Sequence, residues 1–317
     1  MQSFAGAAQP PTPAAPPDGR WDTVVIGGGP GGLTGALYLA RFRRRVLLID
    51  AGGSRAAAIP WSHNYPGFPQ GVAGSDLLDR LSRQVGEHAV TLQPGRVDGL
   101  ERDGDSAEGD LVVQGTSFGA CRTRTVLLAT GATDVWPDLP AAAQALRDGV
   151  LRFCPVCDGY EIADRPVGVL TRDGSGVQEA LYLRHFTSDV TVFLCGDDVV
   201  LDADQLHRLR EAGIQVAEAP PRAFVRCEGG VAVTHGDRRS VCAALYSAFG
   251  MTVHSSLATS LDAQADAGGY LVVDGRQQTS VPGLYAVGDV ASGLNQISVA
   301  TGGAAIAAAT IHQALRR

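Results

Sequence analysis

One stretch near the N-terminus constrains the fold more than any other part of the chain. The apolar run 22–26 (DTVVI) is typical of a β-strand and leads directly into the glycine-rich stretch 27–32 (GGGPGG). A helical pattern of apolar residues follows, and a second apolar run, 46–49, ends at Asp50. This order of strand, G-x-G-x-x-G turn, helix, strand and acid is typical of a dinucleotide-binding βαβ unit. It predicts an α/β fold with a parallel sheet.

Each residue of this motif has a separate physical task. Gly27 permits the tight turn, Gly29 lets backbone N–H groups approach a pyrophosphate, and Gly32 lets the helix pack closely against the sheet. The N-terminus of the helix favours the negative charge of the phosphates, and the Asp50 carboxylate can accept a hydrogen bond from a ribose hydroxyl. We therefore predict that these four residues bind a dinucleotide. A glycine-rich turn with a purely structural task is the alternative.

Composition and charge exclude several classes of function. The 317 residues include 33 acidic and 26 basic ones, all of the latter Arg, which gives a net charge of −7 and argues against nucleic-acid binding. Without any Lys, the chain has no Schiff-base or P-loop lysine. Residues 1–20 contain five Pro and no signal-peptide pattern, so we expect a disordered leader and a cytoplasmic protein. Polar residues interrupt the apolar tract 299–315, which favours a buried helix over a membrane span.

Two later segments indicate which dinucleotide is bound. The run 126–132 (VLLATGA) ends in the turn of Thr130 and Gly131, and the run 284–290 (LYAVGDV) contains Gly288 and Asp289. With the N-terminal motif, these segments resemble the FAD domain of flavoproteins that have two dinucleotide-binding domains. The resemblance implies that Asp289 binds the ribityl chain of FAD. It also implies that the last helix, which begins near Gln296 and Ile297, points its N-terminus at the flavin pyrimidine ring and stabilises negative charge there.

The heptapeptide 153–159 (FCPVCDG) is the candidate redox centre. Cys154 and Cys157 are separated by two residues, a spacing that allows a small disulfide ring and often lowers a thiol pKa. Zinc would need four ligands, and the sequence has no second CxxC or HxxxH, so no metal is expected. A structural cysteine pair is the other alternative. Asp158 is placed to exchange a proton with the dithiol, or else forms the turn before Gly159.

From residue 21 to the C-terminus the chain resembles the low-molecular-weight thioredoxin reductase family. The resemblance rests on the motifs above and on the loop 62–69 (SHNYPGFP), in which Asn64 matches a flavin-contacting residue. It implies that Cys157 lies against the flavin C4a atom, that Cys154 attacks the substrate disulfide, and that Asp158 is the acid–base group. It also implies that the Thr-Gly and Gly-Asp turns contact FAD.

The same resemblance implies the domain organisation. We expect two Rossmann-like dinucleotide-binding domains, the second inserted in the first, in a homodimer. Residues 21–133 and 254–317 would form the FAD domain, and residues 134–253 the smaller NAD(P)H-binding-like domain that carries the CxxC motif.

The inserted domain departs from the family at the loop that should bind NADPH. Between the predicted strand 167–170 and helix 177–183, Thr171 and Asp173 occupy the positions of the first two glycines, and Gly176 that of the Ala. At about 4 Å and an effective dielectric of about 20, the repulsion between a carboxylate and a phosphate charge costs about 4 kcal/mol per pair. A micromolar affinity corresponds to only about 8 kcal/mol of binding free energy. The following strand leads into 194–200 (LCGDDVV), which lacks the family's arginines. We expect no direct use of NAD(P)H; a shifted binding mode through Arg172 is the alternative.

The sequence thus predicts an FAD-dependent dithiol–disulfide oxidoreductase that exchanges electrons between flavin and the cysteine pair. In one direction, ferredoxin or a reduced flavin carrier supplies the FAD, and the enzyme reduces a thioredoxin-like protein. In the other, the enzyme oxidises a small dithiol, and O2 reoxidises the flavin. A conventional NADPH-dependent thioredoxin reductase is the alternative among enzymes. A flavin-bearing redox sensor without turnover is the alternative from another class.

Overall fold

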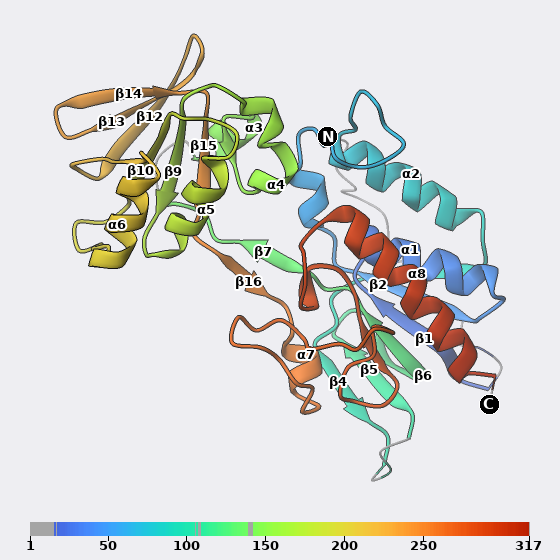
Figure 1. The fold of residues 1–317 in the computed structure, drawn as a ribbon. Helices are drawn as coiled ribbons and strands as arrows, with labels where there is room; N and C mark the ends of the chain where they lie inside the picture. Colours follow the sequence, from blue (N-terminus) through green and yellow to red (C-terminus); the bar gives the residue numbers. More distant parts are fainter. Residues whose placement is uncertain (1–15, 17, 105, 107–108, 139–141, 317) are drawn as a thin grey trace. The chain divides into compact units, whose positions relative to one another are not determined.

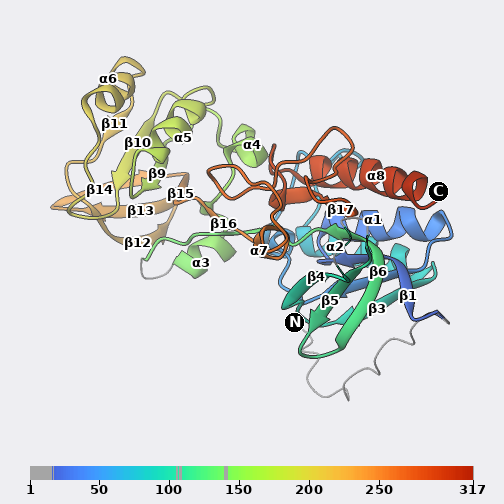
Figure 2. The ribbon, with the colours of Figure 1, turned by 90° about the horizontal axis from the view of Figure 1, so that it is seen from below.

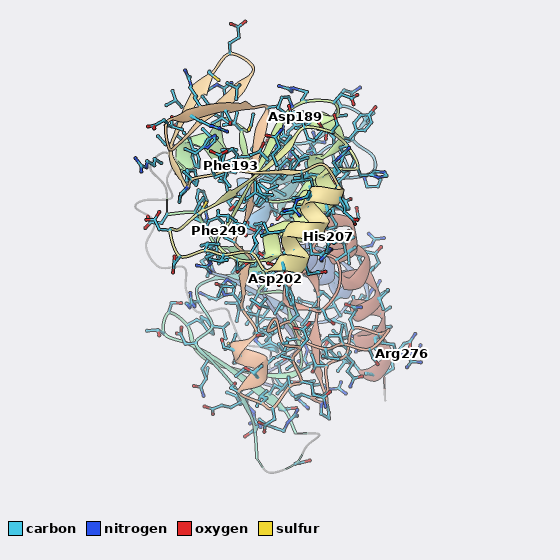
Figure 3. All side chains as sticks on the ribbon, turned by 60° about the vertical axis from the view of Figure 1, so that its left-hand side comes forward. Asp189, Phe193, Asp202, His207, Phe249 and Arg276 are labelled. Atoms are coloured by element: carbon cyan, nitrogen blue, oxygen red, sulfur yellow. A yellow bond between two sulfur atoms is a disulfide. The ribbon has the colours of Figure 1, made fainter. Side chains whose placement is uncertain are left out.

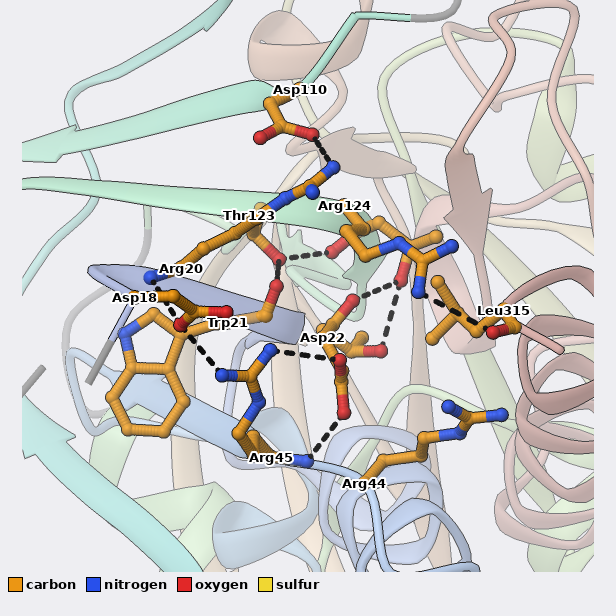
Figure 4. A network of polar contacts seen from close by, with 12 residues as sticks. Asp18, Arg20, Trp21, Asp22, Arg44, Arg45, Asp110, Thr123, Arg124 and Leu315 are labelled. Atoms are coloured by element: carbon orange, nitrogen blue, oxygen red, sulfur yellow. Dashed lines mark hydrogen bonds and ion pairs between the residues drawn. The ribbon is translucent and has the colours of Figure 1, made fainter. Parts of the chain in front are cut away.

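The structure is a computed structural model that describes residues 16, 18–104, 106, 109–138 and 142–316. Most of the expected leader, residues 1–15 and 17, therefore lies outside the described residues. Its predicted end is wrong, because Arg20 already belongs to the first strand. Asp18 is also held in place, since its Oδ1 accepts a hydrogen bond of 2.6 Å from Arg45 Nη1, in the polar network of Figure 4.

The described residues form two compact units, and the first contains the N-terminal motif. It comprises the described residues through Trp61, Tyr65–Thr133, and those from Val253 onward (Figure 1). Its sheet has the strand order β3-β2-β1-β6-β5-β4, and β17 also pairs with β6. The parallel strands are β1 (Arg20–Ile26), β2 (Val46–Asp50), β3 (Val90–Pro94), β6 (Gly119–Leu128) and β17 (Leu284–Ala286). The antiparallel edge consists of β4 (Gly99–Arg102) and β5 (Leu111–Gly115).

Two helices of the first unit pack side by side against this sheet. They are α1 (Pro30–Arg41) and α8 (Ile297–Ala314), and Figure 2 shows them lying together. Leu39, Leu127 and Ile311 are fully buried members of the core that these elements share. The unit also contains α2 (Gly74–Gly86), α7 (Ser256–Thr259) and the short 3₁₀ helices η1 (Arg55–Ala58) and η3 (Gly288–Val290).

The expectation of a buried C-terminal helix is only half right. One face of α8 is buried, but Val299 and Ile306 are each 46% exposed. The helix therefore covers the sheet with one side and presents apolar side chains on the other. No helix among the described residues has the length and apolarity needed to cross a membrane.

The second unit consists of Ser62–Asn64 and Asp134–Thr252. Its parallel sheet has the order β11-β10-β9-β15-β8. These strands are β8 (Leu151–Arg152), β9 (Val167–Thr171), β10 (Val190–Leu194), β11 (Gln215–Val216) and β15 (Ala244–Ala248). The antiparallel strands β12 (Pro221–Cys227), β13 (Gly230–His235) and β14 (Arg238–Cys242) form a second sheet.

Five short helices complete the described part of the second unit. The helices are α3 (Ala142–Arg147), α4 (Pro155–Asp158), η2 (Tyr160–Ile162), α5 (Ser175–Leu183) and α6 (Ala203–Glu211). A capping box starts α6, and in it Asp202 Oδ1 accepts from the Gln205 N–H at 2.8 Å. Figure 3 labels Asp202 at this helix and Phe193 on β10. The predicted α/β class with Rossmann-like parallel sheets is confirmed.

Two short strands lie where the chain passes between the units. They are β7 (Ala132–Asp134) and β16 (Met251–Val253), which pair with each other. On either side, each unit joins its own ends by a backbone hydrogen bond of 3.0 Å: His254 N–H to Gly131 O in the first, and Val135 N–H to Gly250 O in the second. The outgoing and returning segments therefore run together.

Candidate active site

The two predicted redox cysteines form a disulfide at the start of α4. Cys154 is the N-cap residue of this helix, and the Cys157 N–H lies 3.1 Å from Cys154 Sγ. Both cysteines are half-buried, and Val156 between them is 41% exposed. A short helical turn thus closes the ring and leaves it near the surface of the second unit.

The carboxylate of Asp158, the next residue, is held by two donors from neighbouring strands. Tyr246 Oη donates to Asp158 Oδ1 at 2.8 Å, and Arg152 Nη1 lies 3.5 Å from Asp158 Oδ2. Arg152 Nη1 also donates to the backbone oxygen of Asp158 at 3.1 Å. Burial raises the pKa of Asp158 above its ordinary value, and both donors oppose this effect. Two side chains from outside the turn thus contact Asp158.

Two further acidic side chains interact electrostatically with Asp158. Glu161, on η2, helps to raise the pKa of Asp158, and its buried Oε2 has no hydrogen-bond partner among the described residues. On α5, burial and, to a smaller extent, the charges of Asp134 and Asp158 together raise the pKa of half-buried Glu179 to about 8. Asp158, which follows Cys157 in the sequence, therefore interacts with two other acidic side chains, Glu161 and Glu179.

Sequence reasoning missed three residues around Asp158: Arg152, Glu179 and Tyr246. A signal was available for Tyr246, since it lies in an apolar run that predicts a buried strand, where a phenol hydroxyl needs a partner. No local pattern marks Arg152 or Glu179, because their importance depends on the pairing of distant segments.

The glycine-rich turn of the first unit has no room for a Cβ at two of its glycines. Gly27 has φ +109°, and a Cβ there would lie 2.3 Å from the Ala129 carbonyl oxygen. A Cβ on Gly32 would lie 1.8 Å from the Gly27 oxygen. Gly29 is the N-cap of α1, which has no acidic residue in its first turn. The Gly28 N–H donates to Asp50 Oδ1 at 2.9 Å, so the acid lies at the turn.

All but one of the remaining predicted flavin residues lie in the first unit. Gly288 (φ +71°), Asp289, Gln296 and Ile297 lie in the first unit, where Asp289 pairs with Arg55 at 3.2 Å and Gln296 caps α8 without a side-chain bond to the helix. Thr130 and Gly131 lie there too.

Thr130 and Asn64 are engaged in contacts within the protein. Thr130 Oγ1 donates to the His254 oxygen at 2.7 Å, beside Gly131 with φ +65°. Asn64 belongs to the second unit, where its Nδ2 donates to the Val156 oxygen at 3.4 Å. The structure therefore groups Asn64 with the cysteine motif and not with the other predicted flavin residues.

The corresponding turn of the second unit is filled by its own side chains. The buried Thr171 Oγ1 donates to the Asp173 oxygen at 2.7 Å, and Asp173 Oδ1 accepts from the Ser175 N–H at 2.8 Å. Hydrogen bonding to Ser175 lowers the pKa of Asp173, which keeps this carboxylate ionised at the start of α5. A Cβ on Gly174 would lie 2.0 Å from Gln205 Nε2.

The chain is similar in sequence and in structure to known proteins. A family model described as "Pyridine nucleotide-disulphide oxidoreductase" matches residues 21–304. The thioredoxin reductase of Treponema pallidum (strain Nichols) is 29% identical over 300 residues, which are 91% of this chain and 95% of the relative. The crystal structure of HlmI is 32% identical with a TM-score of 0.86, covering 94% of this chain and 93% of HlmI. Thioredoxin reductase from Streptococcus pyogenes is 26% identical with a TM-score of 0.83, covering 94% and 99%.

Proposed function

Because this chain belongs to the pyridine nucleotide-disulphide oxidoreductase family, we propose that it exchanges dithiols and disulfides at Cys154 and Cys157 without taking electrons directly from NADPH or NADH. Its family and its similarity to thioredoxin reductases make it an FAD-dependent disulfide oxidoreductase. FAD, when bound, gives or takes the two electrons that interconvert the dithiol and the disulfide.

The residues proposed to hold FAD come from both ends of the first unit, except Asn64, which belongs to the second unit. The backbone of Gly27, Gly29 and Gly32, together with the N-terminus of α1, would bind the pyrophosphate, because a Cβ would fill this cradle. Asp50 would bind the ribose, and Asp289 the ribityl chain. The N-terminus of α8, at Gln296 and Ile297, would face the flavin ring. Thr130, Gly131, Gly288 and Asn64 complete the proposed set.

The observation that carries the proposal of NAD(P)H independence is the filled turn of the second unit. A pyrophosphate bound there would need the N–H groups at the start of α5. The ionised Asp173 carboxylate already accepts from one of them and would repel a phosphate. The Thr171 side chain lies against Gly176, since a Cβ on this glycine would be 2.5 Å from Thr171 Cβ. The segment after β10 offers Asp197 and Asp198 instead of a cation.

Two points of chemistry define what the cysteines would do. The Cys154 thiolate attacks a substrate disulfide, so that one S–S bond breaks and a mixed disulfide forms. The Cys157 thiolate then displaces the substrate from Cys154, which leaves the Cys154–Cys157 disulfide and a substrate dithiol. Asp158 would take a thiol proton and return it to the leaving thiolate. The sequence runs in reverse when a substrate dithiol is oxidised.

The partner and the electron source are also part of the proposal. The similarity to proteins named thioredoxin reductase supports a thioredoxin-like protein as the substrate, with ferredoxin or a reduced flavin carrier as donor. A small dithiol with O2 as the acceptor is the second candidate, favoured by the same filled turn because this direction also needs no nicotinamide.

An anaerobic titration, followed by the flavin absorption band, distinguishes the proposed NAD(P)H-independent enzyme from a conventional NADPH-dependent reductase. Stoichiometric NADPH, and then NADH, should leave the band of the FAD-loaded protein unbleached, whereas dithionite and dithiothreitol should bleach it. Bleaching by stoichiometric nucleotide would overturn the proposal and make this protein a conventional NADPH-dependent reductase.

Cysteine variants test whether the protein turns over at all. Cys154→Ser and Cys157→Ser should each keep FAD but lose steady-state turnover with a thioredoxin-like protein or a dithiol. Exposed Ser256→Ala serves as a control with full turnover. If the wild-type protein shows no turnover, and the cysteine variants lose only an oxidation-dependent change of conformation, the protein is a redox sensor.

A further inference from the structure

Two residues that no sequence motif marks converge on Asp158. We propose that Arg152 and Tyr246 are positioning residues that hold the Asp158 carboxylate in its ionised, proton-accepting form next to the redox pair. This inference rests on the acid–base role of Asp158 in the proposed function. It goes further by assigning to this chain a set of contacts that controls when Asp158 accepts a proton.

The sheet register explains why these residues meet. Strands β8 and β15 are parallel neighbours, and Arg152 lies directly opposite Tyr246 in their register. Arg152 is the last residue of β8, and α4 begins three residues later, so the chain returns Asp158 to the end of the same pair of strands. Asp158 thus receives one donor from each strand.

The contacts engage both oxygens of the carboxylate. Tyr246 Oη donates to Oδ1 at 2.8 Å, and Arg152 Nη1 lies 3.5 Å from Oδ2. The same two side chains also reach the Asp158 backbone oxygen, at 3.3 Å and 3.1 Å respectively. Tyr246 has no measurable exposure, so water does not compete for its hydroxyl. The Arg152 guanidinium can only donate, and the Tyr246 hydroxyl donates to Asp158 Oδ1. Such donors stabilise a carboxylate more than a carboxylic acid.

The charged and titratable groups around Asp158 pull in opposite directions. Burial, together with Glu161 on η2, raises the pKa of Asp158, and Glu179 on α5 interacts with it as a second acid. Arg152 and Tyr246 lower this pKa. Burial also raises the pKa of Tyr246 above its ordinary range, so the phenol keeps its proton and remains a donor. Without the two donors, the carboxylate would become protonated at a higher pH, and below that pH it could not accept a proton from a thiol.

Their effect falls on one proton transfer. The Asp158 carboxylate accepts the proton of a cysteine thiol, the resulting thiolate breaks the substrate S–S bond, and protonated Asp158 returns the proton to the leaving thiolate. One S–S bond is replaced by another, and no electron leaves the reacting sulfur atoms. Neither Arg152 nor Tyr246 gains or loses a proton in this cycle.

The test is the pH dependence of disulfide reduction in the FAD-loaded protein. Anaerobic dithiothreitol reduces the Cys154–Cys157 disulfide, alkylation stops the reaction, and mass spectrometry of the cysteine-containing peptide gives the rate. Asp158→Asn identifies the inflection that belongs to Asp158, because dithiothreitol contributes equally to every variant. Tyr246→Phe should move this inflection upward by about one pH unit, since a hydrogen bond to a charged group is lost.

The arginine variants and a tyrosine control complete the design. Arg152→Gln should move the inflection upward as well, and Arg152→Lys, which keeps the charge, should restore part of the shift. Tyr285→Phe removes a hydroxyl from another buried tyrosine, on β17 of the first unit, and should leave the inflection unchanged. The arginine series tests the inference independently if Tyr246→Phe fails to fold.

Each result has a distinct meaning. An Asp158→Asn profile identical to that of the wild type would refute the acid–base role in the proposed function, and the inference with it. An inflection lost in Asp158→Asn but unmoved in both Tyr246→Phe and Arg152→Gln would refute the inference alone. A uniform loss of rate without a shift would also refute it, because that is the effect of a purely structural contact.

Discussion

Replacing Glu179 with Gln should remove a loss of stability that the wild-type protein suffers as the pH rises. Burial is the main cause that raises the pKa of this carboxyl to about 8 in the folded chain, from an ordinary 4.5, and Asp134 and Asp158 add to it. A raised folded-state pKa means that the stabilisation is complete below about 4.5. It is lost progressively as the pH rises through about 8, because the unfolded chain ionises first.

The size of the effect follows from the shift. A pKa difference between 4.5 and about 8 corresponds to at most about 5 kcal/mol of unfolding free energy. Glu179 is half-buried and not fully enclosed, so water screens part of this penalty. We therefore expect a loss of about 1–2 kcal/mol between pH 5 and pH 9 in the wild type. The neutral amide of Glu179→Gln should not show it.

Thermal unfolding of the FAD-saturated protein at pH 5 and pH 9 is the assay. The fall in Tm between these pH values should be about 3–6 °C larger for the wild type than for Glu179→Gln. Glu228→Gln, which neutralises an exposed carboxyl in the turn between β12 and β13, is the matched control and should behave like the wild type. Equal pH dependence of the wild type and Glu179→Gln would refute the reasoning.

Two further predictions concern packing and capping. Gly32→Ala should destabilise the protein by about 3 kcal/mol and cause FAD loss on gel filtration, because its Cβ would lie 1.8 Å from the Gly27 oxygen. Gly302→Ala, with nothing within 4 Å of its Cβ, should keep FAD, and the reasoning fails if the two variants behave alike. Asp202→Ala should cost about 1 kcal/mol in urea unfolding, because it removes the bond to the Gln205 N–H. An unchanged unfolding midpoint and slope would contradict that assignment.

Local sequence predicts the parts of the fold that local sterics decide. The turn after β1 needs glycine at Gly27 and Gly32 because a Cβ at either position would meet a backbone oxygen. The motif is therefore visible without knowledge of the rest of the chain. The Cys-x-x-Cys ring is equally local, and its disulfide is present in the structure.

The environment of Asp158 could not be predicted in the same way. Tyr246 is 88 residues away in sequence, and it meets Asp158 only because β15 pairs with β8 in one register. A shift of that register by one residue would turn the phenol to the other face of the sheet. The pKa of Glu179 has the same origin, since the identity of a residue does not reveal its burial. The interplay of the carboxyls is thus a property of tertiary structure.

The paired strands β7 and β16 lie at a position where one domain could have been inserted into another. Each unit closes its own chain ends by a backbone hydrogen bond, between His254 and Gly131 in one and between Val135 and Gly250 in the other. An excision between these bonds would leave neighbouring ends that a short peptide could join. Gene fragments that encode such a segment can enter a host domain without breaking its sheet. The segment that carries the thiols could therefore be exchanged for another at this position, while the first unit keeps its own hydrogen bonds.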